Sequence, residues 1–82
     1  MNFSEALEKL KEGHVIQREG WNSQEQWIYL EDNAIGEHVP KGRKFVPFLV
    51  LRTVQKTYVP WFASQTDLLA EDWEDLGKLT MR

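Results

Sequence analysis

The sequence predicts an α+β fold in which a small antiparallel sheet is accompanied by an N-terminal helix and a short second helix. Three observations lead to it: apolar side chains at helical spacing near the start, several β-rich segments after them, and a helix-capping pattern near residue 64. A chain of 82 residues has the size of one domain. We therefore expect residues 1–82 to form a single domain with one core.

The N-terminal helix is predicted over residues 2–12. Asn2 and Glu5 have the spacing of a capping box, in which each side chain accepts a hydrogen bond from the other residue's amide. Gly13 suits the left-handed backbone position that commonly follows a helix. The apolar stripe that faces the core consists of Phe3, Ala6, Leu7 and Leu10.

The next part of the chain is predicted to hold two strands, at residues 14–18 and 26–31. The loop between them contains glycine, asparagine and serine, which interrupt regular structure. A variable loop is expected at residues 32–44, because glycine, proline and asparagine recur there. Regular structure is therefore expected to resume at residue 45.

The last part of the chain is predicted to add three strands and the second helix. Strands are expected at residues 45–53, 57–62 and 72–76. Because proline cannot donate a hydrogen bond to a neighbouring strand, an edge or a bulge is expected near Pro47. Ser64 and Asp67 have the spacing of a helix start, so the short helix should begin there. Residues from Gly77 onward are expected to form a tail.

The strand at residues 45–53 also predicts self-association. Its residues 45–51 are apolar without alternation, whereas a strand with one solvated face should alternate apolar and polar residues. The two predicted helices are too short to cover both faces of the sheet. We therefore expect a second copy of the chain to provide the missing cover, which makes the protein a homo-oligomer.

Composition and charge exclude several classes of protein. A formal net charge of −3 argues against non-specific DNA binding, which needs a dense field of Lys and Arg. The chain contains no cysteine, so it has neither disulfides nor thiolate metal sites, and no cofactor is expected. The N-terminal residues lack the features of a signal peptide, and the longest apolar run is far below the ~20 residues that span a bilayer. We expect no membrane partner.

Catalytic motifs are weakly represented. His14 follows the first helix and is expected to cap its C-terminal end, whereas His38 is expected to be a solvated loop residue. Neither has the spacing of a metal-ligand pair. An acidic cluster near the C-terminus contains Asp67, Glu71, Asp72, Glu74 and Asp75. Helix capping explains Asp67, whereas Glu71, Glu74 and Asp75 are expected to form a solvated face. An enzyme is therefore the least supported class.

Binding features are more specific. Trp21 lies in a Gly20-Trp21-Asn22 loop, where its ring is expected to present a flat face to a partner. Trp61 precedes the second helix, whose N-terminal amides are donors for an anion. Short polar groups follow at Ser64, Gln65 and Thr66. An aromatic face, amide donors and Asp67 as an acceptor for sugar hydroxyls suit a nucleotide-like ligand. Trp27 and Trp73 are expected in the core, and the position of Trp61 is compatible with either the core or the binding site.

Three segments resemble a family of small phage and prophage proteins, the second described type of Thoeris anti-defence protein. They are residues 2–7 (NFSEAL), 20–22 (GWN) and 60–73 (PWFASQTDLLAEDW). The resemblance implies a sponge without catalytic activity: a homo-oligomer, in the family a tetramer, that sequesters cyclic ADP-ribose isomers made by bacterial TIR-domain enzymes and so blocks Thoeris immunity. It also implies that some members hold cyclic dinucleotides at separate sites. The expected location is the cytoplasm of the host bacterium during phage infection.

The resemblance further implies where the ligand binds. Trp21 would stack on the adenine or cap the pocket, while Asn22 and Asp67 would bond to ribose hydroxyls. Ser64, Gln65 and Thr66, with nearby backbone amides, would meet the phosphates, and Trp61 belongs to the same matched stretch. Arg18, just before the loop, would add a cation for the diphosphate.

Two alternatives stay open from the sequence. The basic run at residues 41–44 is either solvated or serves a second, phosphate-rich ligand. The rival function is a small phage protein–protein interaction module that uses the apolar strand and the tryptophans. A nucleotide signal should stabilise a sponge against heat and leave such a module unchanged.

Overall fold

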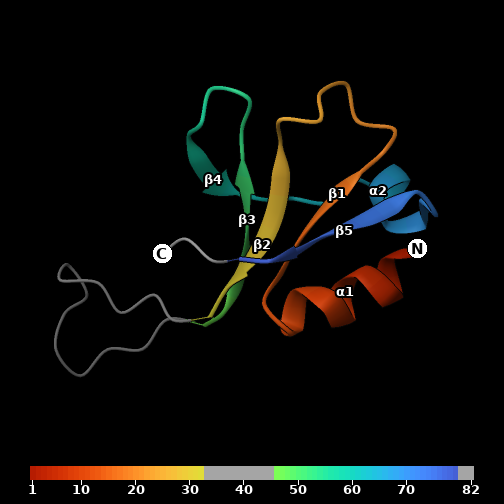
Figure 1. The fold of residues 1–82 in the computed structure, drawn as a ribbon, viewed down its shortest axis with the longest axis horizontal. Coiled ribbons are helices and arrows are strands. Elements are labelled where there is room, and N and C mark those ends of the chain that lie inside the picture. The colour runs from red at the N-terminus through yellow and green to blue at the C-terminus, as the bar shows by residue number, and fades with distance from the viewer. Residues whose placement is uncertain (33–45, 80–82) are drawn as a thin grey trace, which may run out of the picture.

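The computed structural model describes residues 1–32 and 46–79, which form a five-stranded antiparallel sheet with two helices (Figure 1). In chain order the elements are α1 (Phe3–Lys11), β1 (His14–Arg18), β2 (Trp27–Glu31), β3 (Phe48–Arg52), β4 (Tyr58–Pro60), α2 (Gln65–Leu69) and β5 (Trp73–Lys78). The strands lie in the order β4-β3-β2-β1-β5, and each neighbouring pair is antiparallel. The predicted α+β class is confirmed.

Both helices begin with the capping boxes that the sequence predicts. The Asn2 side chain accepts a hydrogen bond from the Glu5 amide at 2.9 Å, and Glu5 accepts one from the Asn2 amide at 3.0 Å. Ser64 and Asp67 repeat this exchange at the start of α2. Helix α1 ends before Gly13, whose φ of 90° lies in the left-handed region that favours glycine.

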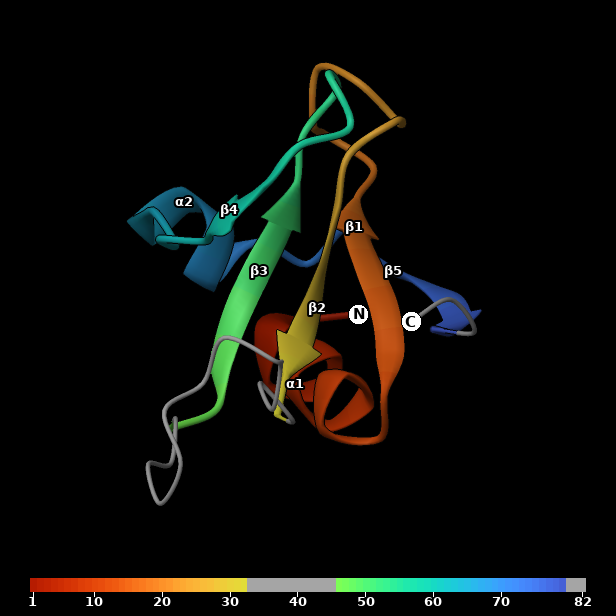
Figure 2. The same cartoon turned by 90° about the vertical axis from the view of Figure 1, so that its left-hand side faces the viewer.

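The core lies between α1 and the strands β1, β2 and β5, against which α1 packs. The strand directions rotate from β3 to β5, so the sheet is twisted (Figure 2). Ile16 on β1 pairs in register with Ile28 on β2, and both side chains are fully buried. The buried cluster consists of Ala6, Leu10, Ile16, Ile28 and Trp73.

The expectation for the core tryptophans is confirmed for Trp73 and wrong for Trp27. Successive side chains of a strand point to opposite faces, so the inward position of Ile28 turns Trp27 to the other face of β2. There Trp27 is half-buried, and the guanidinium carbon of Arg52 lies 4.2 Å from its ring centroid. This arrangement is a cation–π contact on the face opposite α1.

The expected edge or bulge at Pro47 is also wrong. Pro47 precedes β3, which begins at Phe48, so it removes no hydrogen bond from the sheet. Strand β3 is interior, between β2 and β4. Strands β4 and β5 are the edges of the sheet, and β4 contains Pro60. Phe45 and nearly all of the variable loop, with His38 and the basic run at residues 41–44, lie outside the described residues.

The predicted tail from Gly77 is wrong as well, because β5 continues to Lys78. His14 pairs with Lys78 and Ile16 with Asp75, so two residues of β5 lie opposite one residue of β1. Gly77 has a φ of 95°, which permits this bulge without ending the strand. Among the described residues, none of the helices has the length and apolar character needed to cross a membrane.

Candidate functional site

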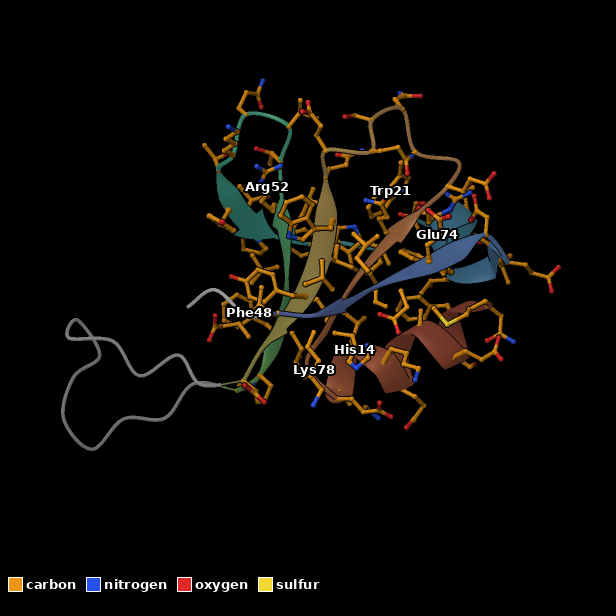
Figure 3. All side chains as sticks on the ribbon, in the orientation of Figure 1. His14, Trp21, Phe48, Arg52, Glu74 and Lys78 are labelled. Carbon is orange, nitrogen blue, oxygen red and sulfur yellow. The ribbon has the colours of Figure 1, made fainter. Side chains whose placement is uncertain are left out.

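Pairing of β1 with β5 brings two distant parts of the chain together. Arg18, the last residue of β1, lies in register with Trp73, the first residue of β5. The loop that follows β1 therefore meets the segment between α2 and β5. In Figure 3 the Trp21 side chain lies in that loop, at the end of β1. Four residues meet at this junction, and we call them the Arg18 cluster: Arg18, Trp21, Asp67 and Asp72.

Arg18 is the centre of the cluster. Its Nε donates to Asp72 Oδ1 at 2.8 Å, its Nη2 to Asp72 Oδ2 at 3.4 Å, and its Nη1 to Asp67 Oδ1 at 3.0 Å. The bonds to Asp72 and then to Asp67 raise the pKa of Arg18 above its ordinary value. A guanidinium has five N–H donors, so these bonds leave two for another group.

Asp67 connects the cluster to the cap of α2. Its Oδ2 accepts from the Ser64 amide at 3.2 Å, while its Oδ1 accepts from both Arg18 and the Trp21 indole Nε1, the latter at 3.3 Å. Burial favours a higher pKa for Asp67, but the hydrogen bonds from Arg18, Ser64 and Trp21 outweigh it and lower the pKa. The carboxylate is therefore ionised at neutral pH.

The tryptophans of the predicted site are packed around Trp73. Trp21 is half-buried, with its ring centroid 5.5 Å from that of Trp73 in an edge-to-face arrangement. Trp61 lies 6.0 Å from Trp73 in the same type of contact and 6.0 Å from Phe3. Both rings thus belong to the rim of the core and keep part of their surface exposed.

The other predicted site residues lie at the surface. Ser64 caps α2, Gln65 and Thr66 form its first turn, and Asn22 follows Trp21 in the loop; all four are exposed. Hydrogen bonds connect Ser64 and Trp21 to Asp67 directly. Asn22, Gln65 and Thr66 are adjacent in the chain to residues of this region, and within residues 1–32 and 46–79 none of their side chains forms a hydrogen bond with the cluster.

Sequence reasoning missed two residues that hold the loop after β1. Asp72 Oδ2 accepts from the Gly20 amide at 2.7 Å, in addition to its bonds with Arg18. The buried side chain of Gln17 donates from Nε2 to the carbonyls of Gln24 and Gln26, at 3.1 and 3.2 Å. No local motif marks either residue, because their partners are defined by strand pairing and loop shape.

Two expectations about charged residues need correction: the helix-capping role of His14 and the solvated face near the C-terminus. The Nδ1 of His14 lies 2.8 Å from the carboxylate oxygens of Asp75, so His14 pairs across the β1–β5 ladder. The Asp75 carboxylate therefore has a partner and is not part of a simple solvated face, whereas Glu71 and Glu74 are exposed. Within residues 1–32 and 46–79, no group of three or more His, Asp or Glu residues could hold a metal ion.

Fold and site together define a small α+β protein in which an arginine, two carboxylates and an indole meet at the surface beside a helix cap. The family of the Thoeris anti-defense 2-like domain matches residues 1–76. A relative from Bacillus phage SP01, Thoeris anti-defense 2, is 34% identical over 83 residues, which cover 90% of this chain and 92% of the relative. The chain therefore belongs to the Thoeris anti-defense 2-like family, which confirms the resemblance found in the sequence.

Proposed function

We propose that this protein is a phage anti-defence sponge that binds and sequesters cyclic ADP-ribose isomers and thereby blocks Thoeris immunity. Membership of the Thoeris anti-defense 2-like family supports the anti-defence part. The observation that carries the binding part is the Arg18 cluster, which places an indole, a cation with unused donors and a carboxylate beside the first turn of α2. Residues 1–82 act in this proposal as one ligand-binding domain.

Each part of the ligand has a matching group in this proposal. The exposed part of the Trp21 ring stacks on the adenine, a contact worth about 1–3 kcal/mol per base in nucleic-acid systems. Asn22 and Asp67 bond to ribose hydroxyls. The two remaining donors of Arg18 meet the diphosphate, because a guanidinium binds phosphate oxygens in pairs.

The first turn of α2 completes the phosphate site. Ser64, Gln65 and Thr66 are exposed there and offer hydroxyl and amide donors. Trp61 closes the side nearest the core, where it is half-buried. Cyclic dinucleotides form a second ligand class to be tested at a separate site.

Sequestration without cleavage fits the electrostatics of the cluster. The bonds that hold Asp67 and Asp72 lower the pKa of both carboxyls, so neither carries a proton to donate at neutral pH. Arg18 remains protonated, since its pKa is raised. These groups can bind and orient a ligand but are poor proton donors and acceptors. We therefore propose that the protein is not an enzyme and that it acts in the host cytoplasm during infection.

Self-association into a tetramer is part of the same proposal. Large apolar side chains stand exposed on β4, on α2 and on the segment that joins them: Val59, Phe62, Leu68 and Leu69. Phe62 is 87% exposed and Leu69 is 79% exposed, values that favour burial against another chain. Because these residues flank Ser64, Gln65 and Thr66, a second subunit at this position would deepen the open ligand site.

The same exposed side chains also favour a second candidate function, a small phage protein–protein interaction module. A thermal-shift measurement separates the two. Addition of a cyclic ADP-ribose isomer should raise the melting temperature of a sponge, and the rise should grow with ligand concentration. The free energy of unfolding increases by RT ln(1 + [L]/Kd). An unchanged melting temperature with cyclic ADP-ribose isomers and cyclic dinucleotides would favour the interaction module.

A further inference from the structure

The loop after β1 (residues 19–26) is joined to the α2–β5 junction mainly through one residue, Asp72. Its Oδ2 accepts from the Gly20 amide at 2.7 Å, and its backbone carbonyl accepts from the Glu19 amide at 3.0 Å. Both carboxylate oxygens also accept from Arg18, at 2.8 and 3.4 Å. One side chain therefore fixes the start of the loop and the orientation of the guanidinium at the same time.

The approach of Asp72 to the loop depends on the glycine at position 20. A Cβ placed on Gly20 would lie 2.6 Å from Asp72 Oδ2, closer than such atoms can stand. The hydrogen bond from Arg18, with a further one from the Gly20 amide, lowers the pKa of Asp72. Asp72 is thus charged at neutral pH, and its bonds to both donors are charge-assisted.

The contacts of Asp72 with Gly20 and Arg18 determine the positions of the proposed binding groups. Trp21 comes immediately after Gly20, and its amide donates back to the Arg18 carbonyl at 3.2 Å. The Trp21 indole and Arg18 Nη1 both donate to Asp67 Oδ1. Movement of Gly20 or of the guanidinium would therefore displace the ring and the unused donors together.

We propose that Asp72 is a positioning residue for ligand binding, which holds the Gly20 amide and the Arg18 guanidinium so that Trp21 and the free Arg18 donors are in place before the ligand arrives. This inference rests on the proposed function and adds a residue that contacts no ligand. A loop that is ordered in advance loses less conformational freedom on binding, so the affinity rises without a new contact.

The test uses Asp72→Asn, which keeps the shape of the side chain and places an amide where one of the oxygens accepts. We expect the ¹⁵N-resolved NMR signals of the Gly20 amide and the Trp21 indole to shift in the free protein. The affinity for a cyclic ADP-ribose isomer, measured by calorimetry, should fall about 10-fold, because the loop and the Arg18 guanidinium must then be ordered during binding. Glu71→Gln removes the same charge from the exposed neighbouring residue and should change neither readout.

A second variant covers the case in which Asp72→Asn does not fold. Gly20→Ala keeps the carboxylate but displaces it, because the added Cβ occupies the position next to Oδ2. It should weaken binding in the same way and shift the Trp21 indole signal. A purely stabilising role for Asp72 would lower the melting temperature and leave the indole signal and the affinity of the folded protein unchanged, which would overturn the proposal. Failure of the unmodified protein to bind any nucleotide would overturn the proposed function. The NMR signals of the Gly20 amide and the Trp21 indole are measured without ligand, so they test the positioning by Asp72 separately.

Discussion

The indole Nε1 of Trp21 donates a hydrogen bond to Asp67 Oδ1 across 3.3 Å, although the two residues are 46 positions apart in the chain. Through this bond the loop after β1 is attached to the cap of α2. The same oxygen also accepts from Arg18 at 3.0 Å. The ring that we propose to stack on the ligand is therefore oriented by a carboxylate that the helix cap holds in place.

Substitution of Trp21 should weaken ligand binding in two distinguishable steps. Trp21→Phe keeps an aromatic face but loses the bond to Asp67, so we expect about a tenfold loss of affinity, because the ring is no longer oriented before the ligand binds. Trp21→Ala also loses the stacking, worth about 1–3 kcal/mol per base, and should weaken binding further. Calorimetric titration with a cyclic ADP-ribose isomer measures both. Trp27→Phe, on the opposite face of the sheet, is the matched control; equal affinities for Trp21→Ala and the unmodified protein would contradict the placement of the ring.

Acid should destabilise the protein through Asp67 and Asp72. Both carboxyls have a pKa below the ordinary value of 3.8 in the folded state. A group of this kind stabilises the fold above its unfolded pKa, and the contribution is lost as the pH falls through the folded pKa. We expect the urea midpoint to drop as the pH is lowered below about 4. Asp67→Asn should flatten this drop. An unchanged pH profile for that variant would show that protonation of Asp67 does not cause the loss of stability in acid.

Self-association should depend on the apolar side chains around α2. The unmodified protein should sediment at micromolar concentration with a mass above that of one chain. The double substitution Phe62→Ser and Leu69→Ser removes the two most exposed of these side chains and should lower that mass. Val54→Ser, at a 45% exposed position in the turn after β3, is the matched control. A monomer in the unmodified protein would rule out the proposed tetramer.

The core around Ile28 should dominate the stability of the described fold. Ile28 is fully buried between β1 and β3, in register with Ile16 and Leu51. We expect Ile28→Ala to lower the free energy of unfolding by about 2–5 kcal/mol, because it deletes buried methyl groups and leaves a cavity. Leu76→Ala, at a 48% exposed site on β5, should cost much less. Urea denaturation measures both, and equal losses would place the core elsewhere.

Local sequence signals predicted most of the elements. The capping boxes at Asn2 and Ser64 could be predicted because each hydrogen-bonded partner is three residues away. The phase of β2 was less certain from sequence, since Trp27, Ile28, Tyr29 and Leu30 are all apolar or aromatic and either face could turn inward. The tail predicted from Gly77 is wrong because the sequence does not show whether a glycine ends a strand or forms a bulge within it, as Gly77 does in β5.

The candidate site was predictable only in part. Trp21, Ser64 and Asp67 could be chosen because the loop and the helix start are local patterns. The bond from Arg18 to Asp72 joins residues 54 positions apart and depends on the pairing of β1 with β5, which no local pattern specifies. For the same reason no local pattern separates Asp72 from the other carboxylates of the acidic cluster, whereas in the structure it holds the loop through Gly20.

The most direct measurement of the sponge function is a release assay. The purified protein is incubated with a cyclic ADP-ribose isomer made by a TIR-domain enzyme, and unbound ligand is filtered away. The protein is then denatured by heat, and the supernatant is examined by mass spectrometry. Recovery of the intact isomer from the unmodified protein, and much less from Trp21→Ala, is the predicted result. Recovery of a cleaved product would reveal an enzyme, and recovery of no nucleotide would contradict sequestration.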